Sequence, residues 1–382
     1  MYLIHQKKGG SVVLSLEMKI EDALFRIKDL YDRTNGKCII SFSGGKDSTV
    51  VAELYLIAKE KGLVNHIPLV FADTKVEFAA IYDFVKWYGE NKQKVEYIKP
   101  KKPFSQVLKE YGKPAMSKVK SDFLSTYQNS LQKNKNPLLG SRTGELITGF
   151  RTGANYEIRL DTNMKPMPTR QKLANKHFNF IHPQHEYKIS AKCCDFLKKQ
   201  PFEKYYEDNS IRGYATGMRI AEGGIRSEMY KSCTAYKTIR IEGKKQRIVH
   251  KMPLFDWTDE DVDMFIETHD IKISEAYTKY GLARTGCIGC PFAKDIENNL
   301  KVLYEYEPKK YKAVQHWLGD VYLDLEIEIP FDKTYTNKLK SRKPIIQQRR
   351  YEMMKKYRSE WAYKWKPKET QISIFDMEVK NE

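Results

Sequence analysis

The chain contains the stretch Ser41-Phe42-Ser43-Gly44-Gly45-Lys46-Asp47-Ser48-Thr49, preceded by the apolar run Cys38-Ile39-Ile40 and followed by Val50-Val51-Ala52-Glu53-Leu54. This order predicts a buried strand, a tight turn at the two glycines and a helix that begins with hydroxyl residues. Glycines let backbone N–H groups approach an anion closely, and a helix N-terminus adds the positive end of its dipole. The stretch therefore predicts a phosphate-binding loop, with Lys46 as its cation.

The loop is not a Walker motif, because the four-residue spacer and the second glycine of that motif are missing. It resembles the SGGKDS pyrophosphate loop of the adenine nucleotide α-hydrolase group, whose members bind ATP or an adenylyl compound and act at the α-phosphate. This resemblance implies nucleotide contacts from Ser41, Ser43, Gly44, Gly45, Lys46, Asp47, Ser48 and Thr49. It also implies that Lys46 and Asp47 take part in catalysis.

Helical and strand-like patterns alternate around the loop. Apolar residues recur at helical spacing from Glu17 to Arg33, and Asn35-Gly36 ends that helix. Alternating strands and helices predict a doubly wound parallel sheet, an α/β fold, whose ligands bind beyond the strand C-termini. Gly44-Gly45 and Asp73-Thr74 fall at such ends. We expect strands at 38–42, 66–72 and 95–98 and helices at 47–61 and 78–88.

The rest of the chain divides by composition. The segment 101–180 is polar, basic and interrupted by Gly and Asn, which predicts an insertion of short helices and loops. The sheet resumes near 213–217, and a helix over 259–269 follows the cap residue Thr258. We expect an N-terminal half of the nucleotide-binding domain at 1–100, the insertion at 101–180, a C-terminal half at 181–330 and a basic helical extension with a tail at 331–382.

Positive charge is a second strong feature of this chain. The 382 residues can bury a sizeable core, and their formal net charge is +18. Basic residues are concentrated between Lys333 and Lys368, and aromatic residues such as Tyr351 and Trp361 lie among them. Basic side chains interleaved with aromatics suit a polyanion with stackable bases. We therefore expect contact with a nucleic acid, tRNA or DNA; the alternative is a solvated basic helix.

Composition also limits the cellular context. No apolar stretch is long enough for a membrane span, and Met1 to Gly10 lacks the apolar core of an export signal. Six cysteines are too few for a disulfide scaffold, and two closely spaced pairs favour metal or redox chemistry. We expect a cytoplasmic protein, and its oligomeric state stays open.

Three further motifs follow the loop in a fixed order. They are Ala72-Asp73-Thr74-Lys75-Val76-Glu77-Phe78, Gly217-Met218-Arg219-Ile220-Ala221-Glu222-Gly223-Gly224-Ile225-Arg226 and Pro253-Leu254-Phe255-Asp256-Trp257-Thr258-Asp259-Glu260-Asp261-Val262. With the loop, they resemble the phosphoadenosine phosphosulfate (PAPS) reductase family and its patterns DTGVEFPET, G-x-R-x-x-[EQ]-S-x-x-R and PL-x-DW-[ST]-x-x-DV. Lys75 stands where that family has Gly, and Gly223 stands where Ser is usual.

The resemblance implies roles for the charged residues of these motifs. Arg219 and Arg226 carry planar, permanently charged groups suited to phosphate or sulfate oxygens, and both are expected in catalysis. Gly217 and Asp73 are expected at the nucleotide, where Asp73 could bind an adenosine ribose or a magnesium ion. Asp47 could hold Mg²⁺ on the pyrophosphate leaving group. Helix capping is the alternative for both carboxylates.

Four cysteines form a second set, Cys193-Cys194 and, far downstream, Cys287-Ile288-Gly289-Cys290. Cys-Cys followed by Cys-x-x-Cys resembles the iron–sulfur branch of the PAPS reductase family, the assimilatory adenylylsulfate reductases, in which four thiolates hold a [4Fe–4S] cluster. Thiolates are soft ligands that suit iron–sulfur clusters or zinc, so zinc and a metal-free buried pair are the alternatives. Cys38 is expected to pack in the first strand.

Two departures from the reductases favour an enzyme that uses ATP. The reductases carry a nucleophilic cysteine in a C-terminal ECGLH-like string, and no cysteine follows Cys290 in this sequence. Their phosphate loop is usually eroded, whereas the SGGKDS loop is intact here. We therefore expect attack at the α-phosphate of ATP with Mg²⁺, release of pyrophosphate and transfer of sulfur to the activated substrate, with a sulfur-donor protein as a further partner.

Two other functions stay open from the residues alone. The chain could be a sulfonucleotide reductase relative whose nucleophile is lost or relocated to Cys233, which follows the Arg226 motif closely. Cys233 is therefore a candidate catalytic thiol, with a structural cysteine as the alternative. The chain could also be a non-catalytic nucleotide- or nucleic-acid-binding subunit of a modification or defence complex, a reading that the retained Lys46 and Asp47 oppose.

Overall fold

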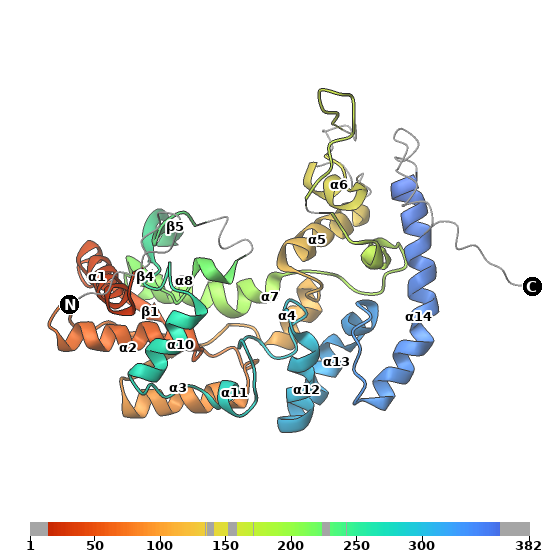
Figure 1. The fold of residues 1–382 in the computed structure, drawn as a ribbon. Coiled ribbons are helices and arrows are strands. Elements are labelled where there is room, and N and C mark those ends of the chain that lie inside the picture. The colour runs from red at the N-terminus through yellow and green to blue at the C-terminus, as the bar shows by residue number, and fades with distance from the viewer. Residues whose placement is uncertain are drawn as a thin grey trace, which may run out of the picture. The chain divides into compact units, whose positions relative to one another are not determined.

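The computed structural model describes residues 14–133, 135, 141–151, 159–170, 172–223, 230–241 and 243–359. The chain divides into two compact units, each formed by two separate stretches of sequence (Figure 1). Unit 1 comprises Met1–Phe104 and Cys194–Ile288, and unit 2 comprises Ser105–Cys193 and Gly289–Glu382.

A sheet with the strand order β3-β2-β1-β4-β6-β5 lies at the centre of the described part of unit 1. β1 pairs in parallel with β2 and β4, β3 and β6 extend this parallel set, and β5 is antiparallel to β6. This is the doubly wound α/β fold that the alternating pattern predicts. The strands are β1 (Cys38–Ser41), β2 (Leu69–Ala72), β3 (Val95–Ile98), β4 (Gly213–Ala215), β5 (Thr234–Ile241) and β6 (Lys244–Lys251).

The helices of unit 1 begin and end where local sequence signals place them. α1 ends at Asn35, which adopts the left-handed conformation with a φ of 50°, and α10 begins with a capping box formed by Thr258 and Asp261. The expected strand at 66–72 begins only at Leu69, because Pro68 has no amide hydrogen for a sheet neighbour. The helices are α1 (Leu16–Thr34), α2 (Lys46–Glu60), α3 (Ala79–Asn91), α8 (Gln200–Asp208), α10 (Asp259–Thr268) and α11 (Glu275–Thr278), with a 3-10 turn η3 (Ile220–Glu222).

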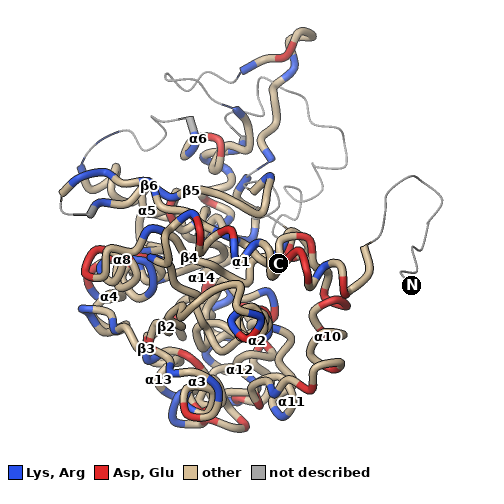
Figure 2. The backbone as a smooth tube through the Cα atoms, turned by 90° about the vertical axis from the view of Figure 1, so that its left-hand side faces the viewer, with Lys and Arg blue, Asp and Glu red and all other residues tan. Residues whose placement is uncertain are grey.

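Apolar side chains from several strands form the core of unit 1. Ile39, Val70 and Ile248 lie in one buried cluster. Cys38 and Trp257 are almost completely buried, which confirms the expected packing role of Cys38. The β5–β6 hairpin is harder to predict, because most of its exposed residues are polar. Several of its residues are Lys or Arg, which are blue in Figure 2. Its one clear local signal is the turn at Gly243, where φ is 75°.

Unit 2 is helical in its described residues. Its elements are α4 (Phe104–Tyr111), α5 (Lys118–Gln132), α6 (Ser141–Thr148), η1 (Asn175–Ile181), α12 (Ile296–Tyr306), α13 (Pro308–Asp324), α14 (Lys333–Met354) and η4 (Lys355–Ser359). A short helix α7 (Lys192–Cys194) continues into the π-helical turn η2 (Asp195–Lys199) and then α8. In the part of the chain that the structure describes, no helix has the length and apolar character needed to cross a bilayer.

Helix α14 supplies both apolar packing and positive charge. Tyr335, Ile346 and Met353 are buried, and the helix packs against η1 and α13. Three of its lysines, Lys338, Lys340 and Lys343, are exposed. Part of the expected basic extension therefore packs in the core of unit 2, and these three lysines lie on its outward side. The last basic and aromatic residues of that extension, Trp361, Tyr363, Lys364, Trp365, Lys366 and Lys368, lie outside the described residues.

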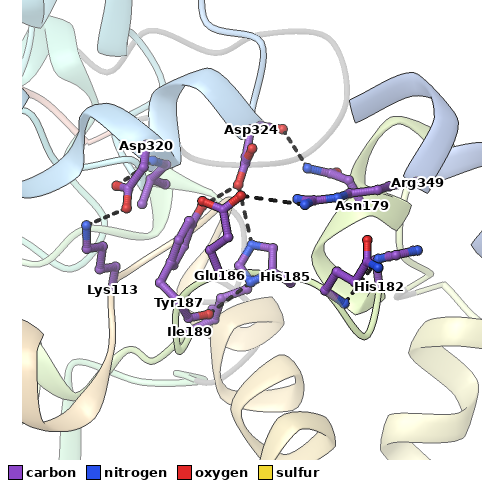
Figure 3. Close-up of polar contacts among 12 residues, drawn as sticks. Lys113, Asn179, His182, His185, Glu186, Tyr187, Ile189, Asp320, Asp324 and Arg349 are labelled. Atoms are coloured by element: carbon purple, nitrogen blue, oxygen red, sulfur yellow. Dashed lines mark hydrogen bonds and ion pairs between the residues drawn. The ribbon is translucent and has the colours of Figure 1, made fainter. Parts of the chain in front are cut away.

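Asp324, the last residue of α13, is the centre of a buried polar network in unit 2 (Figure 3). Its carboxylate accepts hydrogen bonds from Arg342 Nε and the Tyr187 hydroxyl, each at 3.0 Å, and His185 Nε2 lies 3.4 Å from Oδ2. Asn179 Nδ2 donates to the backbone carbonyl of Asp324 at 3.2 Å. The network thus ties α13, α14 and η1 together through a single carboxylate.

Candidate phosphate-binding site

The predicted phosphate loop connects β1 to α2 and turns at its two glycines. Gly44 has a φ of 72°, and a Cβ atom at this position would lie 2.7 Å from Val85 Cγ2 in α3. Any other residue at position 44 would therefore be strained and would collide with α3. Gly45 is the N-cap of α2 and provides no side-chain cap, so the first turn presents backbone N–H groups and the positive end of the helix dipole.

Hydroxyl groups hold the loop in shape. Ser48 Oγ accepts a hydrogen bond from the Ser43 N–H at 3.1 Å and donates to the Gly45 carbonyl at 2.9 Å. Thr49 Oγ1 donates to the same carbonyl at 3.0 Å. Ser48 and Thr49 are buried, whereas Ser43 is exposed. Ser41 is the last residue of β1. Of the predicted hydroxyl donors, Ser43 is thus the one that faces outward, and Ser48 and Thr49 stabilise the turn.

Lys46 begins α2 and is surrounded by two residues from later in the chain. Its Nζ atom lies 2.7 Å from Asp263 Oδ1 on α10 and 5.6 Å from the ring centroid of Tyr277 on α11. Its backbone N–H donates to the Tyr277 hydroxyl at 3.0 Å, and that hydroxyl lies 3.0 Å from Thr285 Oγ1. Burial raises the pKa of Tyr277, so the phenol stays neutral. The Tyr277 hydroxyl and the Asp263 carboxylate are therefore the observed partners of the Lys46 N–H and ammonium groups.

Arg219 lies beside the same helix end and bridges two carboxylates. Its Nε donates to Asp47 Oδ1 at 2.9 Å, its Nη2 donates to Asp259 Oδ1 at 2.6 Å, and only 5% of its surface is exposed. Burial raises the pKa of Asp47 even though Arg219 opposes this shift, whereas the hydrogen bond from Arg219 lowers the pKa of Asp259. A Cβ at Gly217 would lie 2.7 Å from the carbonyl carbon of Asp47, so glycine is needed there. Asp47 thus binds Arg219 and does not cap the helix.

Asp73 follows β2 directly and is buried, with 4% of its surface exposed. Its Oδ2 atom lies 2.7 Å from Lys75 Nζ. Lys75 has a φ of 63°, a left-handed conformation that costs a residue with a Cβ about 1–2 kcal/mol. The glycine that the PAPS reductase pattern has at this position would adopt the same φ without strain.

A cavity of about 120 Å³ lies between the phosphate loop and β2, lined by Ser43, Ala72, Glu77, Lys198 and Thr285 among others. This is smaller than the roughly 300 Å³ of a nucleotide-sized pocket, so it suits one part of a ligand. Lys198 Nζ lies 2.9 Å from Glu77 Oε1. A larger groove of about 760 Å³ in unit 1 is lined by residues of α8 and β5, and no loop residue is among the described residues that line it.

The cysteines of each unit lie next to charged or polar groups. In unit 1, burial opposes the charge on Lys198, but Cys287, Glu77 and Cys194 raise its pKa well above the ordinary value. Cys287 Sγ lies 3.9 Å from Glu77 Oε1. Two of the four predicted ligands are therefore close to one ammonium group. Among the described residues, no group of three or more His, Cys, Asp or Glu side chains is arranged to hold a metal ion.

In unit 2, Cys193 is buried and Cys290 is partly buried. Burial of Tyr322 raises the pKa of its phenol, and the charge of Cys290 raises it further. Tyr322 donates to the Gly289 carbonyl, and the Gly289 N–H donates to Asn299 Oδ1 at 2.9 Å. The backbone of the Cys-x-x-Cys segment is thus held by side chains of α12 and α13.

Among the described residues, no contact brings the predicted catalytic residue Cys233 to the loop. Cys233 precedes β5, its Sγ lies 3.8 Å from Thr234 Oγ1, and its carbonyl accepts from the Met252 N–H at 2.8 Å. Arg226 lies outside the described residues.

Asp263 and Tyr277 lie at the loop but belong to none of the quoted motifs. Asp259 lies within the motif Pro253–Val262, and its four-residue spacing from Asp263 places both on one face of α10. Lys198 follows the Cys193-Cys194 pair closely in the sequence, where it is expected to offset the charge of a thiolate-ligated group.

The parallel sheet, the glycine turn after β1 and the cations Lys46 and Arg219 at the start of α2 define an α/β protein with a candidate phosphate-binding loop. The chain belongs to the phosphoadenosine phosphosulfate reductase domain family, whose model matches residues 37–145 and 150–293. A curated relative, the uncharacterized protein MJ0066 of Methanocaldococcus jannaschii, is 24% identical in an alignment 246 residues long, and this alignment covers 55% of this chain. The chain spans about half the length of that relative, 48%.

Two solved structures align with much of this chain. The phosphoadenylyl-sulfate (PAPS) reductase of Candida auris, in a phosphate complex, is 15% identical with a TM-score of 0.35, covering 73% of this chain and 98% of the reductase. The FMN adenylyltransferase of Candida glabrata, in complex with FAD and inorganic pyrophosphate, is 13% identical with a TM-score of 0.38, covering 74% of this chain and 68% of that chain.

Proposed function

We propose that the chain binds ATP with its phosphates at the loop and cleaves it at the α-phosphate. One observation carries this proposal: Lys46 and Arg219 both stand at the N-terminus of α2, and each is held by a carboxylate of α10. Phosphate oxygens arriving with Mg²⁺ would exchange with Asp263 and Asp259, because both carboxylates are more than half exposed. Phosphate oxygens would then replace these two carboxylates as partners of Lys46 and Arg219.

The reaction that fits this arrangement is adenylyl transfer. An oxygen of the second substrate attacks the α-phosphorus, the bond from that phosphorus to the bridging oxygen of the β-phosphate breaks, and pyrophosphate leaves with the electron pair. Lys46 and the N–H groups of α2 stabilise the charge that develops on the leaving group. Asp47 is the carboxylate that would hold the Mg²⁺ that accompanies ATP. A sulfur nucleophile, supplied by a donor protein, then displaces AMP from the adenylylated substrate.

The proposed acceptor of the sulfur is a nucleic acid, tRNA or DNA. The support is electrostatic, because the formal net charge is +18 and the outward side of α14 carries Lys338, Lys340 and Lys343. Deleting the chain from Lys333 onward would be a poor test, because it would also remove the buried residues of α14. Substitutions of the exposed lysines test the acceptor without disturbing the core of unit 2.

The nucleotide is identified by calorimetry on anaerobically purified protein, with ATP and Mg²⁺ compared with adenylylsulfate and PAPS. We expect the tightest binding for ATP, because the intact loop and Lys46 offer donors for a β,γ-pyrophosphate that sulfonucleotides lack. Tighter binding of a sulfonucleotide would overturn the proposal in favour of a reductase and would direct attention to Cys233.

We also propose that Cys193, Cys194, Cys287 and Cys290 bind a [4Fe–4S] cluster, with zinc as the alternative. The spacing in the sequence and the chemistry of thiolate ligands support this assignment. Lys198, close to two of these thiols, would offset the negative charge of a thiolate-ligated group. When bound, such a cluster supplies electron-transfer chemistry or structural cross-linking.

Cys290→Ser is expected to remove most of the bound metal, because a four-ligand site loses one thiolate. The measurement is iron, zinc and acid-labile sulfide per chain after anaerobic purification. Cys38→Ser, in the buried strand β1, is the matched control and should leave the metal content unchanged. An iron and zinc content that is the same in Cys290→Ser as in the wild type would contradict the assignment.

A further inference from the structure

The β5–β6 hairpin extends beyond the strand that joins it to the rest of the sheet. β4 pairs with β6 only at residues 249–251, whereas β5 and β6 pair from Thr234 opposite Lys251 to Ile241 opposite Lys244. In the described part of unit 1, β5 is the last strand of the sheet on this side. The half of the hairpin next to its turn is therefore a two-stranded ribbon with no third strand paired to it among the described residues.

One face of this ribbon combines an aromatic ring with basic groups. Residues directly opposite each other on antiparallel strands lie on the same face. The face comprises the cross-strand pairs Tyr236–Val249, Thr238–Arg247 and Arg240–Lys245. Apart from Val249, all of these residues are exposed, whereas the buried Ile239 and Ile248 lie on the opposite face. We call this exposed set the hairpin face.

Tyr236 and Arg247 form a flat platform on the hairpin face. The Tyr236 residue is 48% exposed, and the guanidinium carbon of Arg247 lies over its ring, 4.1 Å from the centroid. Bases of an unpaired nucleic-acid strand stack on aromatic rings and on guanidinium planes, and a cation at the ring adds to this attraction. Bases of a duplex are already stacked on one another. The platform therefore favours an unpaired strand.

The hairpin also lines the groove of about 760 Å³ in unit 1, and this groove carries positive charge. Arg240 and Lys245 line it from the hairpin, and Lys99 and Lys101 line it from the segment after β3. We call these four residues the groove cations. All four are exposed, and none of them forms an ion pair with another described residue. Exposed cations without a carboxylate partner suit the phosphates of a polyanion.

The carboxylates of the groove are paired with lysines. Glu203 Oε1 lies 2.8 Å from Lys237 Nζ, and Asp208 Oδ1 lies 2.9 Å from Lys204 Nζ. The hydrogen bond and charge of Asp208, and then the charge of Glu207, raise the pKa of Lys204. Five Lys or Arg residues line the groove against three Asp or Glu residues, so its net charge is positive.

We propose that the hairpin face and the groove bind an unpaired strand of RNA, the kind of strand that a tRNA presents in its loops. Tyr236 and Arg247 stack a base, and the groove cations contact the phosphates on either side of it. This assignment deepens the proposed function and rests on it for the nucleic-acid acceptor. It also selects tRNA over duplex DNA, because the bases of a duplex are not free to stack on Tyr236.

The stacking role is tested by fluorescence anisotropy on the full chain, with a labelled adenine RNA strand of about 12 nucleotides and an abasic strand of the same length as probes. Tyr236→Ala should weaken binding of the RNA about 5- to 100-fold and leave binding of the abasic strand unchanged, because that strand has no base to stack. Tyr236→Phe keeps the ring and should bind the RNA like the wild type. Equal losses for both probes in Tyr236→Ala would overturn the stacking role, and so would a loss in Tyr236→Phe as large as that in Tyr236→Ala.

The phosphate contacts are tested by the salt dependence of the same binding. Replacing Arg240 and Lys245 together by glutamine should lower the slope of log K against log salt by about 1.4, because each lost contact with a single strand removes about 0.7. The matched control replaces Lys59 and Lys61 by glutamine, which removes the same charge from exposed positions at the end of α2. An equal fall in the control would assign the effect to net charge and overturn the site.

The remaining outcomes separate this inference from the proposed function. Duplex DNA that binds at least as tightly as the RNA strand would overturn the inference and keep a nucleic-acid acceptor. Unlabelled tRNA should displace the RNA strand, and a failure to displace it would overturn tRNA as the source of the strand. If only substitution of Lys338, Lys340 and Lys343 weakens RNA binding, the acceptor stands and the hairpin site is wrong. A wild-type chain that binds neither RNA nor DNA would overturn both.

Discussion

Replacing Lys46 by alanine is expected to lower the rate of pyrophosphate release from ATP by about 100- to 1,000-fold, the effect of removing one positioned charge from a transition state. Lys46 stands at the N-terminus of α2, where its ammonium adds to the helix dipole and to the N–H groups of the first turn. Its ion pair with Asp263 is largely exposed, so losing it should change the free energy of unfolding by about 1 kcal/mol or less. The measurement is pyrophosphate release together with thermal unfolding.

Two controls make this result specific. Lys59→Ala removes an exposed lysine from the other end of α2 and should leave both the rate and the melting temperature unchanged. Asp263→Asn breaks the ion pair but keeps the Lys46 ammonium, so turnover should persist. If Asp263→Asn lowers the rate as much as Lys46→Ala does, the rate depends on the ion pair between Lys46 and Asp263 and not on a contact of the Lys46 ammonium with the phosphates. An undiminished rate in Lys46→Ala would contradict the loop assignment directly.

Asp324→Ala is expected to lower the free energy of unfolding of unit 2 by about 1.5–3 kcal/mol, because it removes a buried carboxylate that accepts charged and neutral hydrogen bonds, while Arg342 keeps its ion pair with Glu186. Arg342 Nε would lose its acceptor, and the Tyr187 hydroxyl would lose its hydrogen bond. The measurement is urea unfolding at neutral pH, with a probe that reports on unit 2. Asp320→Ala is the matched control, because Asp320 lies one turn earlier in α13 and its ion pair with Lys113 is partly exposed.

The same carboxylate makes the stability of unit 2 depend on pH. Burial acts to raise the pKa of Asp324, but the hydrogen bond from His185 and the charge of Arg342 outweigh it and lower the pKa. A carboxyl group with a lowered pKa contributes stability above its unfolded pKa, near 4, and loses that contribution as pH falls through its folded pKa. The gap in unfolding free energy between wild type and Asp324→Asn should therefore narrow below about pH 4. A difference in unfolding free energy that widens below about pH 4 would contradict a lowered pKa for Asp324.

The part of the fold around the phosphate loop could be predicted because its signals are local. The apolar run before Gly44-Gly45, the left-handed turn at Asn35 and the capping box at Thr258 each depend on residues a few positions apart. The β5–β6 hairpin lacks such a signal, because polar side chains cover its outward surface. The departure from the PAPS reductase pattern at position 75 was also informative. Lys75 adopts a left-handed conformation that is strained for lysine, whereas a glycine at this position would adopt it without strain.

By itself, the sequence determined the α/β class, the loop at the end of β1 and the identity of the cations and thiols, because spacing along the chain controls helix ends, turns and strand burial. The tertiary structure alone decided which groups meet: Asp263 and Tyr277 at Lys46, Asp259 and Asp47 at Arg219, and Lys75 at Asp73. Most of these partners are separated by tens to hundreds of residues. Their contacts depend on how helices pack at the edge of the sheet, and local sequence carries no record of that packing.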